Sequence, residues 1–469
     1  MQESIPRDPI RRPARGRRVV DVSALPVFAL ASTGLALFLL YTNLPVVAAQ
    51  FGPVARAGAI VVPALLLAAV AHQTVIRRRP VVIDRTLLLM TAFLVVLLVS
   101  SFAVVGQRVA VDRIAVFLGE GILIYFLVRN AVQRLPELRM AVVVILAAAT
   151  LLAGLTVFQA VSGDYEQTFM GLAQRSLELS DGRPPSVEAE IGLEDRARGP
   201  LDEPNRFAQI LLMAAPLAFV LGLGAGRVST RGLAWACGGL ILAAVLLTYS
   251  RGALVTLVVL TVLMAPLALV RPGRLVVAVA VGGLLTVIAV PGLTNRIVSM
   301  AGVADLFGQS RVEADGPIRG RTTEMLAAIA AYADHPVLGV GPGQYAPYHS
   351  VRYQGLPEIS FREIPIPRRA HSLYLEIAAE TGTVGLVIFL AIPLLLLLDL
   401  ERLRRSLVSG RPKLAHLAAG FTLMLLAYLG TGVFLHLAFE RYYWLMIALA
   451  ASAVGALRHA ESEEPGPAR

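Results

Sequence analysis

Four arginines and one histidine in this sequence adjoin predicted helix ends or tight turns. They are Arg206, Arg251, Arg321, Arg369 and His371. A guanidinium stays charged in a protein and can donate two parallel hydrogen bonds to a diphosphate. A neutral imidazole can accept a proton from a hydroxyl group. The set therefore predicts diphosphate binding by the arginines and general base catalysis by His371.

Each of these side chains also has an ordinary structural explanation. Arginines at the ends of membrane helices commonly extend to phospholipid headgroups, and a histidine there commonly hydrogen-bonds to a loop carbonyl. Two features favour the chemical interpretation. We expect helix N-termini at Arg206 and Arg321, where N–H groups and the helix dipole attract anions. A helix that begins at His371, next to Arg368 and Arg369, should disfavour the charged imidazolium.

Several acidic and polar residues accompany this set. Glu376 and Glu380 follow His371 on the same predicted helix but lie about 140–180° around it, so we expect them to pair with loop arginines. A supporting or acceptor-binding role is the alternative for five residues. They are Asn205, Tyr249, Glu376, Glu380 and Glu440. No His/Cys cluster has the spacing of metal ligands, so neither a metal nor a cofactor is expected.

Composition restricts the class of protein. Of the 469 residues, 56% are hydrophobic and 16% are charged, whereas soluble domains have roughly 25% charged residues. The single cysteine, Cys237, excludes a disulfide scaffold. A net charge of +10 can indicate nucleic-acid binding, but the basic residues lie between apolar segments. We therefore expect the protein to lie in a lipid bilayer and not to bind nucleic acid.

Twelve apolar segments approach the length of about 20 residues that crosses a bilayer. The fourth is the least regular, because Asp112, Arg113 and Glu120 interrupt it. We expect an all-α polytopic membrane protein with about 12 transmembrane helices. The segments are 25–42, 57–76, 86–105, 111–128, 140–161, 206–224, 232–249, 253–270, 275–291, 373–398, 415–435 and 442–457.

The distribution of basic residues predicts the orientation of these spans. With the N-terminus in the cytoplasm, 24 basic residues fall in cytoplasmic segments and five in or beside the four short outer connections, counting Arg113 near the start of the fourth span. This asymmetry agrees with the positive-inside rule. Both termini are then cytoplasmic, and the arginines and His371 lie at the outer face. The expected regions are a basic tail (1–24), nine spans (25–291), an outer loop (292–370), three spans (371–457) and a C-terminal tail (458–469).

Two long outer loops, residues 162–205 and 292–370, separate the spans. The first is acidic, and its stretch Leu179–Gly199 is expected to be disordered or to become ordered only with a partner. In the second loop, residues 320–333 are predicted to form a helix with one apolar face. Three glycines that follow this helix at alternate positions mark tight turns. They are Gly339, Gly341 and Gly343.

These motifs together resemble those of the O-antigen ligase and polymerase family. Arg369-Ala370-His371-Ser372-Leu373-Tyr374-Leu375-Glu376, continued by Glu380, Gly382 and Gly385, is similar to the family's H-(N/S)-x-x-L…E-x-G-x-x-G segment. Three further motifs match in order: Asp202-x-Pro204-Asn205-Arg206, Ser250-Arg251-Gly252 and Arg321…His335-Pro336-x-Leu338-Gly339-x-Gly341-x-Gly343. One position departs from the family. Many members have an aromatic residue shortly after the loop arginine, where this chain has Thr322, Thr323, Glu324 and Met325.

The resemblance implies a membrane glycosyltransferase of C-type architecture, active at the outer face of the bacterial cytoplasmic (inner) membrane. Such an enzyme moves a glycan from a polyprenyl diphosphate carrier to a glycan, lipid or protein acceptor, and it inverts the anomeric centre without a metal. By position, Arg251 and Arg321 would bind the diphosphate and Arg206 would assist them. His371 would accept or orient the proton of the acceptor hydroxyl. Polymerase and ligase activities both stay open.

A transporter or flippase for a lipid-linked glycan is the alternative function, since it would also need many spans and outer arginines. It predicts ionisable groups near the membrane midplane and repeat symmetry. Only Glu120 fits the first requirement, and the sequence has no evident repeat. A non-catalytic membrane scaffold is a third interpretation. Retained activity after His371→Ala would favour either of these over the enzyme.

Overall fold

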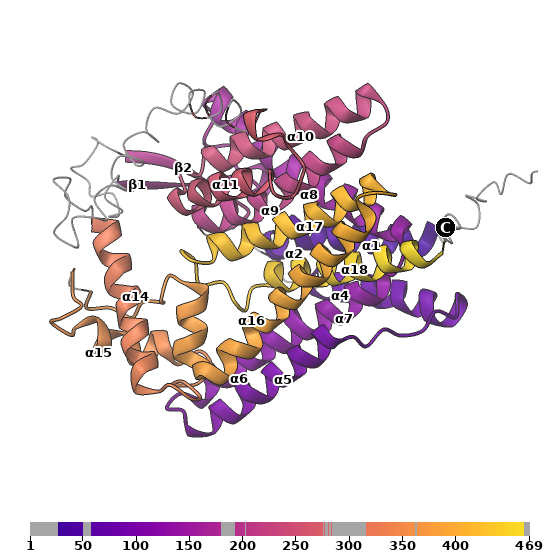
Figure 1. The fold of residues 1–469 in the computed structure, drawn as a ribbon. Helices are drawn as coiled ribbons and strands as arrows, with labels where there is room; N and C mark the ends of the chain where they lie inside the picture. Colours follow the sequence, from indigo (N-terminus) through magenta and orange to yellow (C-terminus); the bar gives the residue numbers. More distant parts are fainter. Residues whose placement is uncertain are drawn as a thin grey trace, which may run out of the picture.

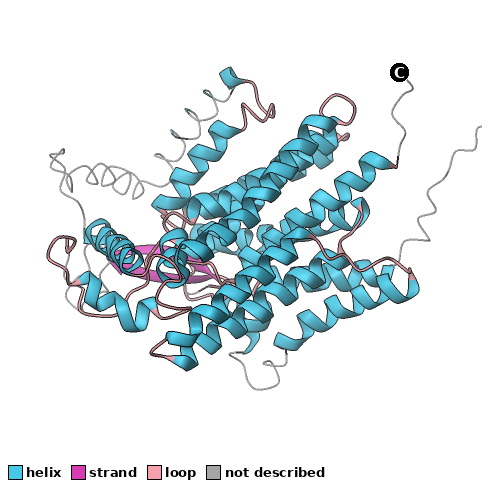
Figure 2. Cartoon of the chain, turned by 60° about the horizontal axis from the view of Figure 1, so that its bottom comes forward, coloured by secondary structure: helices cyan, strands magenta, loops and turns pink. Residues whose placement is uncertain are grey.

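The computed structural model describes residues 27–49, 58–179, 193–201, 203–274, 276, 280, 283, 316–361 and 364–463. Over these residues the chain is a bundle of helices with one two-stranded antiparallel sheet (Figures 1 and 2). Before the sheet lie α1 (Val27–Tyr41), α2 (Leu44–Ala48), α4 (Gly58–Ala71), η3 (His72–Ile76), α5 (Arg85–Ser100), η4 (Ser101–Ala103), α6 (Gln107–Val116), η5 (Phe117–Leu123), α7 (Ile124–Ala131), α8 (Leu135–Ser162) and η6 (Phe169–Gly171). The sheet pairs β1 (Gln174–Leu179) with β2 (Leu193–Gly199). After it lie α9 (Pro204–Gly224), α10 (Val228–Leu246), α11 (Arg251–Leu263), α14 (Gly316–Asp334), η8 (Tyr345–His349), α15 (Ser350–Gln354), α16 (Leu373–Leu407), α17 (Pro412–Thr431) and α18 (Arg441–Ser462).

The described helices coincide with eleven of the twelve predicted spans, and the ninth, 275–291, lies largely outside the described residues. Within the described part of the chain, six helices are long and apolar enough to cross a membrane, and shorter apolar helices occupy other predicted spans. The irregular segment 111–128 is divided into α6, the π-helix η5 and α7, with Glu120 inside η5. The structure thus confirms an all-α polytopic membrane protein. The six long helices are α8, α9, α10, α16, α17 and α18.

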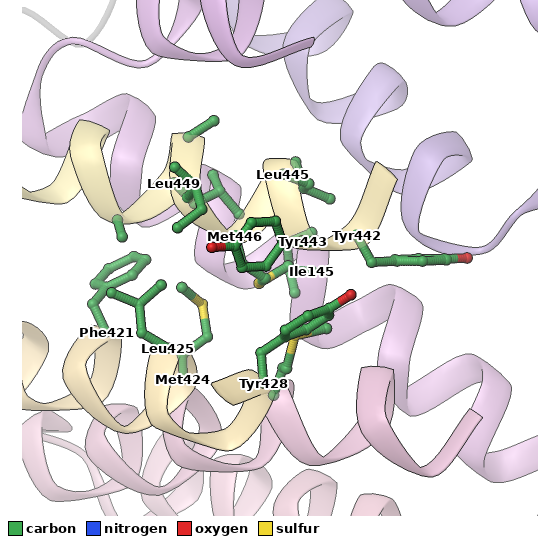
Figure 3. Close-up of a cluster of buried hydrophobic side chains, with 14 of the residues drawn as sticks. Ile145, Phe421, Met424, Leu425, Tyr428, Tyr442, Tyr443, Leu445, Met446 and Leu449 are labelled. Atoms are coloured by element: carbon green, nitrogen blue, oxygen red, sulfur yellow. The ribbon is translucent and has the colours of Figure 1, made fainter. Parts of the chain in front are cut away.

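Helices α9, α17 and α18 form the interior of the bundle. Their most apolar windows are 72–78% buried, whereas that of α10 is only 17% buried. A helix that is apolar on every side needs such a position. Figure 3 shows Phe421, Met424 and Tyr428 of α17 facing Tyr443 and Met446 of α18. These central helices provide a fixed frame for the loops at their ends.

The elements of the two long loops gather at one end of the bundle. In Figure 1 the sheet, α14 and α15 lie at the end opposite the C-terminus. Residues Leu193–Gly199 form a strand, so the expectation of disorder is wrong for this part of loop 162–205. Residues 180–192 lie outside the described residues.

Helix α14 contains the predicted helix 320–333 but begins four residues earlier, at Gly316. Proline fits the first turn of a helix, because its missing N–H has no helical partner to lose, and Pro317 occupies that turn. Arg321 therefore lies in the second turn. The expectation that Arg321 stands at a helix N-terminus is wrong.

The long helix α16 is interrupted at Gly382. This residue has φ 64° and ψ −165°, a region essentially restricted to glycine. The interruption leaves some backbone N–H and C=O groups of α16 without helical hydrogen-bond partners. The glycine-rich segment after α14 supplies other partners for these groups. On the N-terminal side, the carbonyls of Ala379 and Glu380 accept hydrogen bonds from the N–H groups of Val340 (2.8 Å) and Gly341 (3.0 Å).

The same segment also accepts hydrogen bonds from the part of α16 that follows the interruption. The N–H groups of Thr383 and Val384 donate to the carbonyls of Pro336 (2.8 Å) and Val337 (3.3 Å). Irregular backbone at membrane depth is tolerated only where protein or a water-filled cavity satisfies it. The loop that carries α14 is therefore fixed to α16 by hydrogen bonds on both sides of Gly382.

We expect Gly382→Ala to lower the free energy of unfolding by roughly 2–6 kcal/mol, from ~1–3 kcal/mol of backbone strain and ~1–3 kcal/mol of steric overlap. A Cβ at this position would collide with the backbone of Val337. Thermal unfolding of the purified protein in detergent measures the loss. Gly239→Ala in α10 is the control, because a Cβ there meets no heavy atom within 4 Å. Equal midpoints for the two variants would contradict this account.

Candidate functional site

A small pocket joins the segments that carry the sequence motifs. Its lining comes from the start of α9, the turn before α11, the second turn of α14 and the connection between α17 and α18. Segments more than 200 residues apart in the chain therefore meet at one point. The lining residues are Asn205, Ser250, Gly252, Ala253, Arg321, Thr431, Phe434 and Leu435.

The start of α9 contributes Arg206 and Asn205 to this region. Arg206 lies in the first turn and is within 3.5 Å of two carboxylates, those of Glu203 and Glu440. Asn205 donates to Glu203 (2.8 Å) and accepts from the buried guanidinium of Arg196 (3.2 Å). These contacts fix the side chain of Asn205 and place Arg206 between two acidic groups.

The turn before α11 is held in a strained conformation. Tyr249 has a φ of 52°, which is unusual for a non-glycine residue. The Ser250 hydroxyl caps the helix by accepting from the N–H of Ala253 (3.4 Å). Arg251 is the first residue of α11, and Arg196 donates to the carbonyl of Thr248 (2.9 Å). The N-terminus of α11 therefore adjoins the pocket, with Arg251 at its start.

Arg369 is engaged by protein groups on two sides. It forms an ion pair with the buried carboxylate of Glu376 and donates to the carbonyl of His436 (2.8 Å). Arg369 thereby links the segment before α16 to the connection between α17 and α18. Glu376 contacts a loop arginine and not His371. Arg369 has been predicted as a donor ligand, but its described contacts are those of a residue that orders the site.

His371 lies two residues before α16, which begins at Leu373 with Ser372 as its cap. The prediction that the helix begins at His371 is therefore wrong by two residues. His371 has a φ of 48°, a strained conformation of the kind that clusters at functional sites. Its Nε2 lies 3.5 Å from Oε2 of Glu324 on α14. Its ring meets that of His436 edge-on, with centroids 4.9 Å apart.

Burial, assisted by the surrounding arginines, lowers the pKa of both histidines and favours their neutral form. Burial lowers the pKa of His371 well below its usual value, and Arg321, His436 and Arg368 lower it further, with Glu376 acting in the opposite direction. Burial also lowers the pKa of His436, to about 2, together with four nearby guanidinium groups. These belong to Arg369, Arg206, Arg113 and Arg321. An uncharged His371 is able to accept a proton.

Two residues at this site have no role in the motif-based prediction. Arg113 of α6 places its guanidinium 5.0 Å from the centroid of the Phe439 ring and acts electrostatically on His436. An arginine inside an apolar segment is itself a signal of function. Glu324 lies three residues after Arg321 on α14, where helical spacing places both on one face.

The remaining predicted residues occupy supporting positions. Glu380 is buried in α16, where the backbone N–H of Gly343 and the guanidinium of Arg113 act on its carboxylate. Glu440 occupies the N-cap position of α18, without a capping hydrogen bond from its side chain, and faces Arg206. Glu120 pairs with Arg441 at 3.6 Å. Among the residues described, no group of three or more His, Cys, Asp or Glu side chains is placed to hold a metal ion.

Fold and site together define a multi-pass membrane protein in which Arg321 lines a small pocket and the pKa values of two buried histidines, His371 and His436, are lowered. Residues 236–390, about a third of the chain, match the family model described as O-antigen ligase. This match confirms the resemblance to the O-antigen ligase and polymerase family. It contains Arg251, Arg321, Glu324 and His371, whereas Arg206 lies outside it. No curated protein matches the chain.

We expect acid to destabilise the native protein through His436. In the unfolded chain this histidine becomes protonated below about pH 6.5. In the native state its pKa is lowered to about 2, so it stays neutral over most of the acidic range. The unfolded state then binds more protons, so stability falls as the pH falls, by about 1.4 kcal/mol per pH unit for each such group. His436→Gln should remove one such contribution. Unfolding midpoints between pH 7 and pH 4 measure it, and identical pH dependence in the variant would contradict the assignment.

Proposed function

We propose that this chain transfers a glycan from a polyprenyl diphosphate carrier to an acceptor hydroxyl at the outer face of the bacterial cytoplasmic membrane. The observation that carries the proposal is the meeting of Arg321, the start of α9 and the start of α11 at one pocket, close to the neutral His371. The family match supports glycan transfer of the O-antigen ligase or polymerase type. The carrier lipid and the stereochemistry are parts of our proposal.

The chemistry is a single displacement. His371 accepts the proton of the acceptor hydroxyl, and the hydroxyl oxygen forms a bond to the anomeric carbon of the donor. The bond from that carbon to the diphosphate oxygen breaks, and its electron pair leaves with the diphosphate. Attack opposite the leaving group inverts the anomeric centre. Positioned guanidinium groups stabilise the charge that develops on the diphosphate, without a metal or other cofactor.

The arginines have different parts in this scheme. Arg321 lines the pocket itself, and Arg251 begins the helix whose N-terminus adjoins it. Arg206 completes the cationic group from α9 while facing Glu203 and Glu440. Arg369 orders the connection that carries His436. We therefore assign donor binding first to Arg321 and Arg251, with Arg206 assisting.

We expect Arg321→Ala to reduce transfer by about 10²–10³-fold, the usual cost of removing one group that stabilises developing charge. Transfer from a purified lipid-linked donor into a labelled acceptor measures the rate. Arg352→Ala is the matched control, because Arg352 is an exposed arginine in the same outer loop. Full activity of the Arg321 variant, with both variants inserted equally, would remove Arg321 from the donor site.

We expect His371→Ala to reduce transfer by about 10²–10⁴-fold, the range for loss of a general base. Mass spectrometry of lipid-linked glycans from cells with this variant then identifies the acceptor class. Accumulated single repeat units would indicate a polymerase, and accumulated complete chains a ligase. An unchanged profile would contradict catalysis by His371 and favour a transporter or a scaffold.

A further inference from the structure

The carboxylate of Glu324 is the described acidic group nearest to the imidazole of His371. Oε2 of Glu324 lies 3.5 Å from Nε2 of His371, and the exposed fraction of the Glu324 side chain is only 8%. The two residues come from different elements, α14 and the segment before α16. The hydrogen bonds around Gly382 fix those elements to each other. The contact is therefore built into the fold.

The two other nearby carboxylates are directed elsewhere. Glu376 forms an ion pair with Arg369. Glu380 is acted on by the N–H of Gly343 and by Arg113 and Arg369. The other groups that face His371 are Arg321, Arg368 and the ring of His436. None of these is a carboxylate. Glu324 is thus the acid positioned to act on the imidazole.

The two ring nitrogens of His371 have different surroundings. Nε2 faces Glu324, whereas Nδ1 is buried and makes no hydrogen bond to any described residue. A neutral imidazole carries one N–H group and one lone pair, and a carboxylate only accepts hydrogen bonds. The arrangement favours the proton on Nε2. The lone pair is then on Nδ1.

We propose that Glu324 is a positioning residue, which holds His371 in the Nε2–H tautomer and leaves Nδ1 to receive the proton of the acceptor hydroxyl. The tautomer assignment depends on the fold alone, while the proton transfer rests on the function proposed above. Carboxylates commonly orient a histidine through its second nitrogen in this manner.

The tautomer can be tested without any activity measurement. Nitrogen-15 NMR of the full chain, labelled at histidine and held in lipid bilayers, distinguishes Nε2–H from Nδ1–H imidazole. The signal missing from His371→Ala identifies the residue. We expect Nε2–H in the wild type, and a mixed or reversed tautomer in Glu324→Gln, because an amide can also donate to Nε2. Nδ1–H in the wild type, or an unchanged tautomer in the variant, would overturn the proposal.

Kinetics test the second part of the proposal. We expect Glu324→Gln to lower kcat by about 10–100-fold, the usual effect of losing such a supporting partner, with the donor KM unchanged and partial rescue in Glu324→Asp. Glu358→Gln, an exposed carboxylate of the same loop, should retain wild-type kcat. A raised donor KM with unchanged kcat would overturn the positioning role.

The acid side of the pH–rate profile gives a further readout. A carboxylate stabilises imidazolium, so its removal lowers the pKa of His371 and should move the acid limb of kcat to lower pH. Arg321, Arg368, Glu376 and His436 face the same imidazole and are unchanged in the variant. An acid limb that stays in place would count against Glu324. If the NMR result holds but the wild type transfers no glycan, the proposed function fails and the tautomer assignment stands.

Discussion

The interruption of α16 at Gly382 determines much of the geometry at the end of the bundle that carries the pocket. A helix inside a membrane protein can lose backbone hydrogen bonds only where other protein groups or water replace them. The segment 336–341 supplies the replacements on both sides of the interruption, so it has one possible position along α16. Since α14 leads directly into this segment, the same bonds decide where Arg321 and Glu324 lie relative to His371. The glycine motif and the histidine motif thus form one structural unit.

Much of this architecture follows from the sequence. Apolar segments of the right length predict the helices of the bundle, and the predicted helix 320–333 lies within α14. The motifs predict that Arg206, the turn at Ser250 and Arg321 lie together, and residues from these segments line one pocket. These features depend on local pattern, on side-chain chemistry or on resemblance.

Other features depend on contacts between distant segments, and local pattern could not predict them. The pairing of Glu324 with His371 spans 47 residues, and that of Arg206 with Glu440 spans 234. Arg113 reads as an interruption of its span, yet it acts on His436 from the side of α6. The sequence does not predict the two-stranded sheet, because β2 is polar and charged. The contacts of its Arg196 are with the distant carbonyl of Thr248 and with Asn205.

The arginines at this site differ in how firmly carboxylates hold them. Arg369 has a close, multiply hydrogen-bonded partner in the buried Glu376, and removing a partner from such a pair leaves an uncompensated buried charge. Arg206 faces Glu203 and Glu440 at 3.5 Å, and both of those carboxylates are partly exposed. Water can solvate these two acids if Arg206 turns to an anion, whereas Glu376 has no such compensation. The partly exposed partners of Arg206 therefore allow it to exchange a carboxylate for another anion. The buried partner of Arg369 keeps that arginine paired, so that it orders the site, although both guanidinium groups carry the same charge.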